Sequence, residues 1–240
     1  MIASTLEALG PPVLVRDRAF EQVWDAIISG RIQPGTRLIE RELCDAMGIS
    51  RASVREVIRR LEAERLVTVE PRRGPTVVTL TPEQASEIYE IRAMLESLVI
   101  RRFTERAGLA DIATLEAIFA EMTRAAGAED VPRIVLLVHR FNDHLLAVAG
   151  HGTAGDMLAH LDARISWLRV KAMAVPGRLR TSIDEMGAVL QAVRSGDADA
   201  AAALITKTVF NARDAAVAEM TRSGVPAKPP AKPRKRQDKR

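Results

Sequence analysis

Six long stretches with the hydrophobic period of an α-helix follow one another between Pro82 and Arg222, with Gly or Pro-Gly breaks between them. Apolar residues at helical spacing are the main sequence signal of amphipathic helices, and no β-branched run interrupts this region. The expected helices span residues 82–107, 111–126, 130–149, 153–174, 178–195 and 197–222. Aromatic residues make up only 3% of the chain. A core built mainly from Ala, Leu, Val, Ile and Met favours a bundle of helices.

The first 80 residues have a different pattern. Apolar spacing predicts three short helices, from Asp17 to Gly30 and over residues 40–47 and 51–65, with Ser50 as the N-cap of the third. Two β-branched runs, 66–69 and 76–80, flank the turn 71–75 and predict a hairpin. The expected fold class is mostly α, with an N-terminal winged helix-turn-helix followed by an all-helical effector-binding bundle. The expected organisation is a leader at 1–15, a winged helix at 16–80, a helical domain at 81–222 and a basic disordered tail at 223–240.

Composition and charge exclude several classes of protein. One cysteine, Cys44, allows neither a disulfide framework nor a multi-cysteine zinc site. The longest apolar run, 134–138, is too short to span a bilayer, and residues 1–10 do not read as a signal peptide, so the cytoplasm is the expected location. Seven Lys or Arg and one Asp give residues 225–240 a charge of +6, against +4 for the whole chain. Such a tail either contacts nucleic-acid phosphates or is a solvated terminus.

The third expected helix has two distinct faces. At 100° per residue, one arc holds the apolar side chains expected to be buried, which are Val54, Val57, Ile58 and Leu61. The neighbouring face carries Arg51, Arg55 and Arg59. An arginine can bind guanine O6 and N7 bidentately or clamp a phosphate, and the hairpin tip at Arg73 and Gly74 adds a basic wing. The alternative is a surface helix with ordinary salt bridges to its own glutamates.

Residues 16–80 resemble the winged helix of the GntR family of bacterial transcription regulators. The resemblance rests on residues 32–43 (IQPGTRLIEREL), 48–56 (GISRASVRE) and 61–67 (LEAERLV), and on Arg73-Gly74 at the wing tip. It implies that Gly74 lets the wing approach the minor groove. It also implies that operator DNA is contacted by a set of five side chains, namely Arg41, Ser50, Arg51, Ser53 and Arg55.

The helical half resembles the effector domain of the fatty-acid-regulator (FCD) branch of that family, through residues 89–96 (YEIRAMLE) and 193–201 (VRSGDADAA). Most members of the branch hold a metal ion with one Asp and three His. Counting from Gly150 and Gly196 places those positions at Val138, Asn142, Met186 and Thr208. These side chains do not form the usual ligand set of a divalent ion, so neither a metal nor another cofactor is expected.

The bundle is still expected to contain a ligand cavity. Arg92 is the candidate partner of an organic acid, Asn142 and Thr208 are candidate hydrogen-bonding groups, and Met186 and Trp167 are candidate apolar walls. A structural alternative stays open. Asn142 and Thr208 are then tolerated polar groups of the core, and Arg92 forms a salt bridge with Glu96 four residues on.

The function expected from both halves is a DNA-binding transcription regulator, a ligand-responsive repressor controlled by a small organic acid. The alternative is a constitutive DNA-binding dimer whose helical domain serves only oligomerisation. An enzyme is not expected, because Ser, His and Asp are not arranged to activate a nucleophile and no Gly-rich phosphate loop is present. The expected partners are a double-stranded operator, a carboxylate effector and a second copy of the chain, without a membrane.

Overall fold

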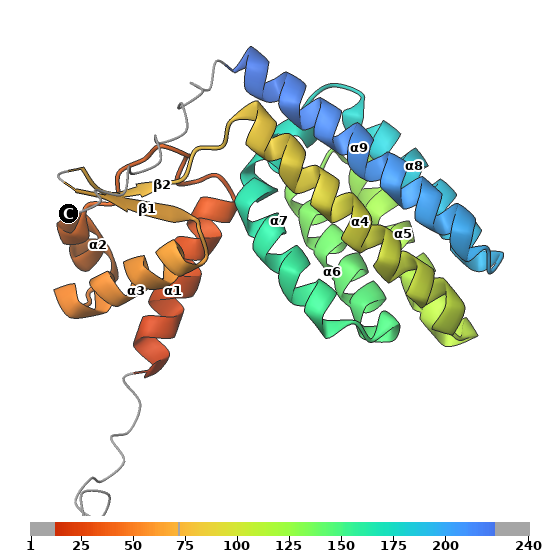
Figure 1. The fold of residues 1–240 in the computed structure, drawn as a ribbon, viewed down its shortest axis with the longest axis horizontal. Helices are drawn as coiled ribbons and strands as arrows, with labels where there is room; N and C mark the ends of the chain where they lie inside the picture. Colours follow the sequence, from red (N-terminus) through yellow and green to blue (C-terminus); the bar gives the residue numbers. More distant parts are fainter. Residues whose placement is uncertain (1–12, 72, 224–240) are drawn as a thin grey trace, which may run out of the picture.

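The fold was obtained as a computed structural model, which describes residues 13–71 and 73–223 (Figure 1). The N-terminal body, residues 13–80, contains α1 (Val13–Ile28), α2 (Glu40–Met47), α3 (Arg51–Ala63), β1 (Val67–Glu70) and β2 (Gly74–Val77). The helical bundle, residues 81–223, contains α4 (Pro82–Arg106), α5 (Leu109–Gly127), α6 (Val131–Ala149), α7 (Gly152–Met173), α8 (Arg178–Arg194) and α9 (Ala198–Arg222). The expected mostly α fold, with its winged helix-turn-helix and helical bundle, is confirmed.

The helix-turn-helix is fixed by its two helix ends. Gly48 ends α2 in the left-handed region, with φ at 65°, where a residue without a Cβ is favoured. Ser50 then caps α3, because its hydroxyl accepts a hydrogen bond from the backbone N–H of Ser53 at 3.2 Å. The apolar stripe predicted for α3 is confirmed, since its four members are the buried residues of this helix. The arginines on the neighbouring face, Arg51, Arg55 and Arg59, are exposed.

The wing differs in detail from the sequence prediction. β1 and β2 are antiparallel, with Val67 opposite Val77 and Glu70 opposite Gly74, whereas the second strand was expected at 76–80. The chain leaves the sheet after Val77 because Leu80 is buried in the core of the bundle. Residues 35–38 run along the free edge of β2. The Gly35 N–H donates to the carbonyl oxygen of Val77 and the Leu38 N–H to that of Pro75, both at 2.9 Å.

Two other predicted boundaries were wrong. The first helix begins at Val13 rather than Asp17, so it extends into the expected leader. The third ends at Ala63 rather than Arg65, because Arg65 has φ at 56° and turns the chain toward β1. The rest of the leader and the tail at 224–240 lie outside the described residues.

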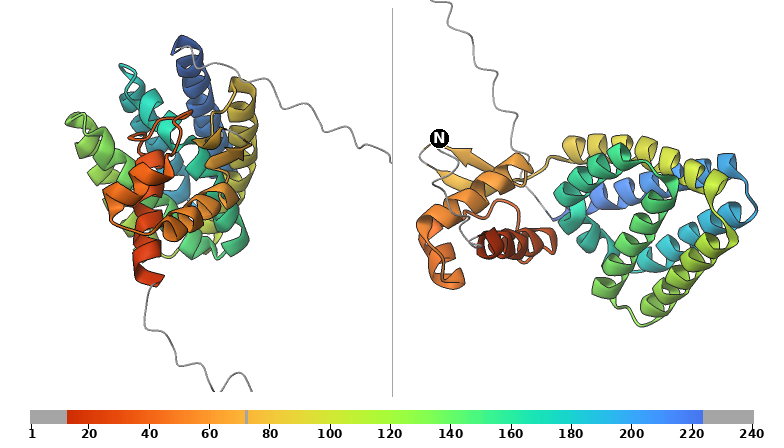
Figure 2. Two further views of the ribbon diagram at one scale, coloured as in Figure 1. Left: turned by 90° about the vertical axis from the view of Figure 1, so that its left-hand side faces the viewer. Right: turned by 90° about the horizontal axis from the view of Figure 1, so that it is seen from below.

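The six helices of the bundle agree with prediction to within two residues at each end. α4 opens with a reciprocal cap, in which the Thr81 hydroxyl accepts from the Gln84 N–H and the Gln84 side chain accepts from the Thr81 N–H. α5 starts two residues earlier than predicted because the Asp111 carboxylate accepts a hydrogen bond from the Gly108 N–H. Figure 2 shows α4 and α9 side by side along their length. No helix among the described residues is long and apolar enough to cross a membrane.

The N-terminal body rests on α7 of the bundle (Figure 1). Ala163 on α7 is buried in the same apolar cluster as Val23 and Ile27 of α1. Trp167, one turn further along α7, packs under Gly30. One helix of the bundle therefore completes the core of the body that carries α3.

Candidate nucleic-acid interface and effector cavity

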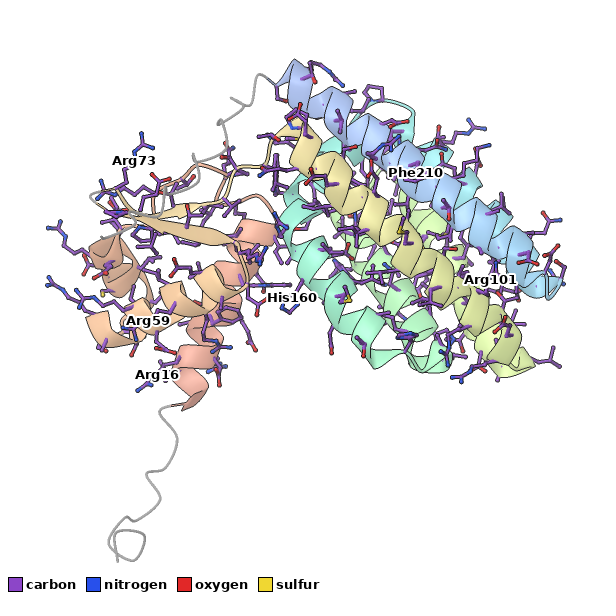
Figure 3. All side chains as sticks on the ribbon, viewed as in Figure 1. Arg16, Arg59, Arg73, Arg101, His160 and Phe210 are labelled. Atoms are coloured by element: carbon purple, nitrogen blue, oxygen red, sulfur yellow. The ribbon has the colours of Figure 1, made fainter. Side chains whose placement is uncertain are left out.

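Three arginines lie exposed on one face of α3. Arg55 is held by α2, because its Nε lies 3.1 and 3.2 Å from the two carboxylate oxygens of Glu40. Arg59 lies 3.6 Å from the carboxylate of Glu56, and Arg51 has no ion pair within the described part of the chain. Figure 3 shows Arg59 and Arg73 on the side of the N-terminal body that faces away from the bundle. This face therefore presents several guanidinium groups without obstruction by the bundle.

The start of α3 brings the remaining candidate residues of the helix-turn-helix together. Ser50 has a structural role as the cap, and its hydroxyl lies 3.0 Å from that of Ser53. Arg41 follows Glu40 on α2, and its side chain is 82% exposed and lies 3.9 Å from Asp45. The unpaired N–H groups at the start of a helix favour phosphate oxygens. Three of the five helix-turn-helix candidates, Ser50, Arg51 and Ser53, thus lie at the N-terminus of α3.

The wing contributes a second basic surface. Arg73 is exposed, 3.5 Å from the carboxylate of Glu70, and Gly74 has φ at 74°. A Cβ on Gly74 would lie 3.5 Å from the guanidinium of Arg37, which packs against the hairpin. Arg37 and Arg73 line the same groove along the wing. Sequence reasoning missed Arg37. Its signal was a basic residue that follows the turn at Gly35.

A cavity of about 90 Å³, the central cavity, lies between the six helices α4, α5, α6, α7, α8 and α9. It is lined by Arg92 and by the four residues that stand at the metal-ligand positions of the FCD branch. These are Val138, Asn142, Met186 and Thr208. Helices far apart in sequence therefore bring these five residues to one space. Among the described residues, no group of three His, Cys, Asp or Glu is placed to hold a metal ion.

The expectation for Trp167 was wrong, because this side chain does not line the central cavity. Arg169 does, and two residues along a helix differ by 200°, so Trp167 lies near the opposite face of α7. It packs in the cluster beneath the linker, with Leu80 and Tyr89. Its apolar surface joins the bundle to the N-terminal body.

Four buried charges surround one end of the central cavity. Arg92 lies 2.6 Å from Glu96 and 2.7 Å from Asp162, and Asp162 lies 2.9 Å from Arg169. The salt bridge from Arg92 to Glu96 considered as the structural alternative is thus present, and the same guanidinium still faces the cavity. Arg169 and Arg178 also line the cavity. Sequence reasoning missed both, since neither stands out by local pattern.

The four charges perturb one another. Burial raises the pKa of Glu96 despite the attraction of Arg92. Burial also acts to raise the pKa of Asp162, but Arg169 and Arg92 outweigh it, so this pKa is lowered. Burial opposes the charge of Arg92, but Glu96 and Asp162 outweigh it and raise its pKa. Asp162 is therefore the firmly ionised carboxylate of the group, and Glu96 is the one that takes up a proton more readily.

The comparisons with known proteins agree with this architecture. Residues 87–210, about half of the chain, match the FCD domain, and residues 15–77 match the family described as bacterial regulatory proteins, gntR family. The chain belongs to the GntR family. It is a DNA-binding transcription regulator, not an enzyme. Its candidate DNA contacts lie in the GntR match and its central cavity lies in the FCD match.

Individual relatives of this GntR regulator cover both halves of the chain. It is 28% identical over 184 residues to the uncharacterized HTH-type transcriptional regulator YdhC of Bacillus subtilis, covering 76% of this chain and 82% of that protein. It is 27% identical over 210 residues to the galactonate operon transcriptional repressor of Escherichia coli, covering 77% and 89%. The structure of E. coli McbR/YncC has the same fold, with a TM-score of 0.71 at 22% identity, covering 82% and 94%.

Proposed function

We propose that this GntR regulator is a repressor that binds a two-fold-related operator as a homodimer and responds to a small organic acid in the central cavity. The observation that carries the proposal is the charge of the cavity lining. Three guanidinium groups, those of Arg92, Arg169 and Arg178, line the cavity within the described chain, against one carboxylate, that of Glu96. A lining with this excess of positive charge favours an anion.

The other carboxylates near the cavity pair with these arginines from outside the lining. Asp162 binds Arg92 and Arg169 but is not part of the lining. Glu185 binds Arg178 at 3.1 Å, and its second oxygen accepts from Asn211 at 2.8 Å, again outside the lining. An acid that enters the cavity would bind the guanidinium N–H groups that these partners leave free, or compete with the partners. Fixed arginines of this kind are suited to bidentate binding of a carboxylate.

Glu96 is the group that a carboxylate effector would displace. It occupies Arg92 at 2.6 Å, and its pKa is raised by burial. Burial disfavours the ionised form of Glu96, so we expect an incoming carboxylate to compete with it for Arg92. Asn142 and Thr208 offer hydrogen bonds to the rest of the ligand. A cavity of about 90 Å³ suits a compact acid, and one relative is named for the operon of a sugar acid, galactonate.

A homodimer is supported by apolar side chains exposed on α4. Met94 is 75% exposed and Leu98 is 38% exposed, four residues apart on one face. Exposed apolar side chains at helical spacing mark association surfaces. Two copies joined in this way would present two α3 helices to two half-sites. The site of action we propose is the cytoplasm, where a bacterial operator lies.

The decisive experiment separates this proposal from a constitutive DNA-binding dimer. An operator selected from random DNA with the purified protein is titrated in the presence of small carboxylic acids, including galactonate and gluconate. We expect at least one acid to raise the Tm and to weaken operator binding. The variant M186F, which fills the central cavity, is expected to lose this response, while L136F on the exposed face of α6 keeps it. If no acid changes either property, the constitutive alternative is favoured.

The dimer is tested independently of the effector. A charge placed in an apolar interface is left without solvent, so M94E is expected to shift the protein from dimer to monomer in size-exclusion chromatography with light scattering. L109E is the control, because Leu109 is 88% exposed at the start of α5. A dimer that survives M94E would show that α4 does not form the interface.

A further inference from the structure

A second cavity lies between the end of α3 and the bundle. This interdomain groove, of about 410 Å³, lies between Arg65, Arg164 and the apolar side chains of Ile91, Met157 and Leu161. Arg65 is the second residue after α3, Ile91 belongs to α4, and the other three belong to α7. The groove shares no residue with the central cavity. Its two sides belong to the DNA-binding body and to the effector bundle.

The two guanidinium groups of the groove lack partners. Neither Arg65 nor Arg164 has an ion pair or a side-chain hydrogen bond within residues 13–71 and 73–223, and the Nε of Arg164 is buried without a hydrogen-bond partner. A buried donor without a partner costs free energy that a bound acceptor recovers. Burial lowers the pKa of Arg164, and the nearby charge of Arg65 lowers it further. Two like charges therefore lie close together, and neither has an ion pair within the described residues.

The acidic groups around the groove do not neutralise this pair. Glu64 lies 3.3 Å from His160, so its carboxylate is engaged across the same interface. Glu87 attracts Arg164 but makes no ion pair with it, and Asp156 is exposed at the rim. Arg65 and Arg164 therefore remain without an ion pair, among the described residues, in a groove that also has apolar walls. This arrangement matches an anionic head with an apolar body.

We propose that the interdomain groove binds a small organic anion, a carboxylate or a phosphate monoester, with its head between Arg65 and Arg164 and its apolar body against Ile91, Met157 and Leu161. This site goes beyond the proposed effector site and does not depend on it. The bound anion relieves the repulsion between the two arginines and satisfies the Arg164 Nε.

Occupancy of the groove has a structural consequence. Arg65 is the second residue after α3, and Arg164 belongs to α7 of the bundle. An anion shared by the two arginines joins these elements and favours the arrangement in which they lie together. A ligand that binds one arrangement better than another shifts their populations by that difference in affinity. An anion in the groove would thus give the regulator a second way, besides the central cavity, to fix the position of α3 relative to the bundle.

The test uses the full-length protein and isothermal titration calorimetry. The probes are sodium octanoate and hexyl phosphate, with 1-octanol as the neutral control. The variants are R164Q and R65N, each of which removes one guanidinium. Asn is chosen at Arg65 because it tolerates the left-handed conformation found there, with φ at 56°. R124Q removes an exposed charge outside the groove, and M186F fills the central cavity.

We expect at least one anionic probe to bind and 1-octanol not to bind. R164Q and R65N should each weaken this binding by about tenfold or more, since each removes a charge-assisted hydrogen bond. R124Q and M186F should leave it unchanged. The proposal is overturned if neither anion binds, or if binding survives in the double variant R65N/R164Q. R65N, at an exposed position, keeps the test decisive if R164Q does not fold.

Discussion

The carboxylate of Asp162 on α7 approaches the guanidinium of Arg92 on α4 to 2.7 Å, and both side chains are largely buried. The same carboxylate binds Arg169 at 2.9 Å. One acid therefore bridges two guanidinium groups beside the central cavity. This contact ties the helix that follows the wing to the helix that supports the N-terminal body.

Replacing Asp162 with Asn should destabilise the protein strongly. Arg92 and Arg169 would lose their shared carboxylate, and breaking a buried ion pair by removing one partner costs about 3–5 kcal/mol of the free energy of unfolding. Urea denaturation measures the loss. D143N is the control, because Asp143 is exposed on α6 and has no ion pair within the described chain. Equal stability of the two variants would contradict the role given to Asp162.

Arg55 is expected to read the operator. Glu40 orients its guanidinium without burying it, so the group is available to a guanine or a phosphate. R55A should weaken specific binding by about 1–3 kcal/mol if the contact is bidentate to a base. Fluorescence anisotropy with operator and scrambled DNA distinguishes base reading from phosphate binding, and R124A serves as the control. Unchanged affinity and sequence preference would exclude α3 as the reading helix.

The basic tail is expected to add phosphate contacts. Deletion of residues 225–240 removes a charge of +6, and fewer counterions are then released on binding. The plot of log affinity against log salt concentration should become shallower. The same slope for the full chain and the truncated chain would show that the tail stays clear of the DNA.

His139 should make the protein sensitive to mild acid. Burial lowers its pKa below the ordinary value of 6.5, and Arg169 lowers it further. The unfolded chain then binds the proton more readily, so stability falls as the pH drops below about 6.5 and through the lowered pKa of the folded state. H139Q should remove this part of the pH dependence in urea denaturation between pH 5 and 8. If the free energy of unfolding changes with pH in the same way for H139Q and the wild type, this assignment is refuted.

The regulator is expected to work without a metal ion, because Val138 and Met186 stand at two of the four positions around the central cavity and neither is a ligand for a hard cation. Elemental analysis of the tag-free protein after dialysis should find no stoichiometric zinc, nickel or manganese. Stoichiometric metal that N142A removes would overturn this expectation.

Helix positions were largely predictable because glycines and caps mark them in the sequence. Gly48, Thr81 and Gly150 each fix a helix end by local chemistry. The end of α3 was misplaced since Arg65 adopts a left-handed conformation that its residue type does not signal. The start of α1 was misplaced because Pro11 and Pro12 were read as a loose leader, although a helix begins directly after them.

The candidate sites were predictable only where the pattern is local. The arginine face of α3 and the pairing of Arg92 with Glu96 follow from helical spacing. The contact of Arg92 with Asp162, and the meeting of Arg65 with Arg164, depend on how distant helices pack. Trp167 was assigned to the wrong face because its helix borders both the cavity and the N-terminal body. Helical spacing alone does not say which face meets which neighbour.

The presence of Ala163 in the core of the N-terminal body limits how this regulator can be divided. An excised fragment ending near Leu80 would lose that covering and expose Trp24 and Ile28 to water. A chimaera that joins this N-terminal body to another effector domain would need a small residue at the position of Ala163 on the helix that replaces α7. The two modules are thus not freely interchangeable, and new combinations have to be repacked at this seam as well as joined through the linker.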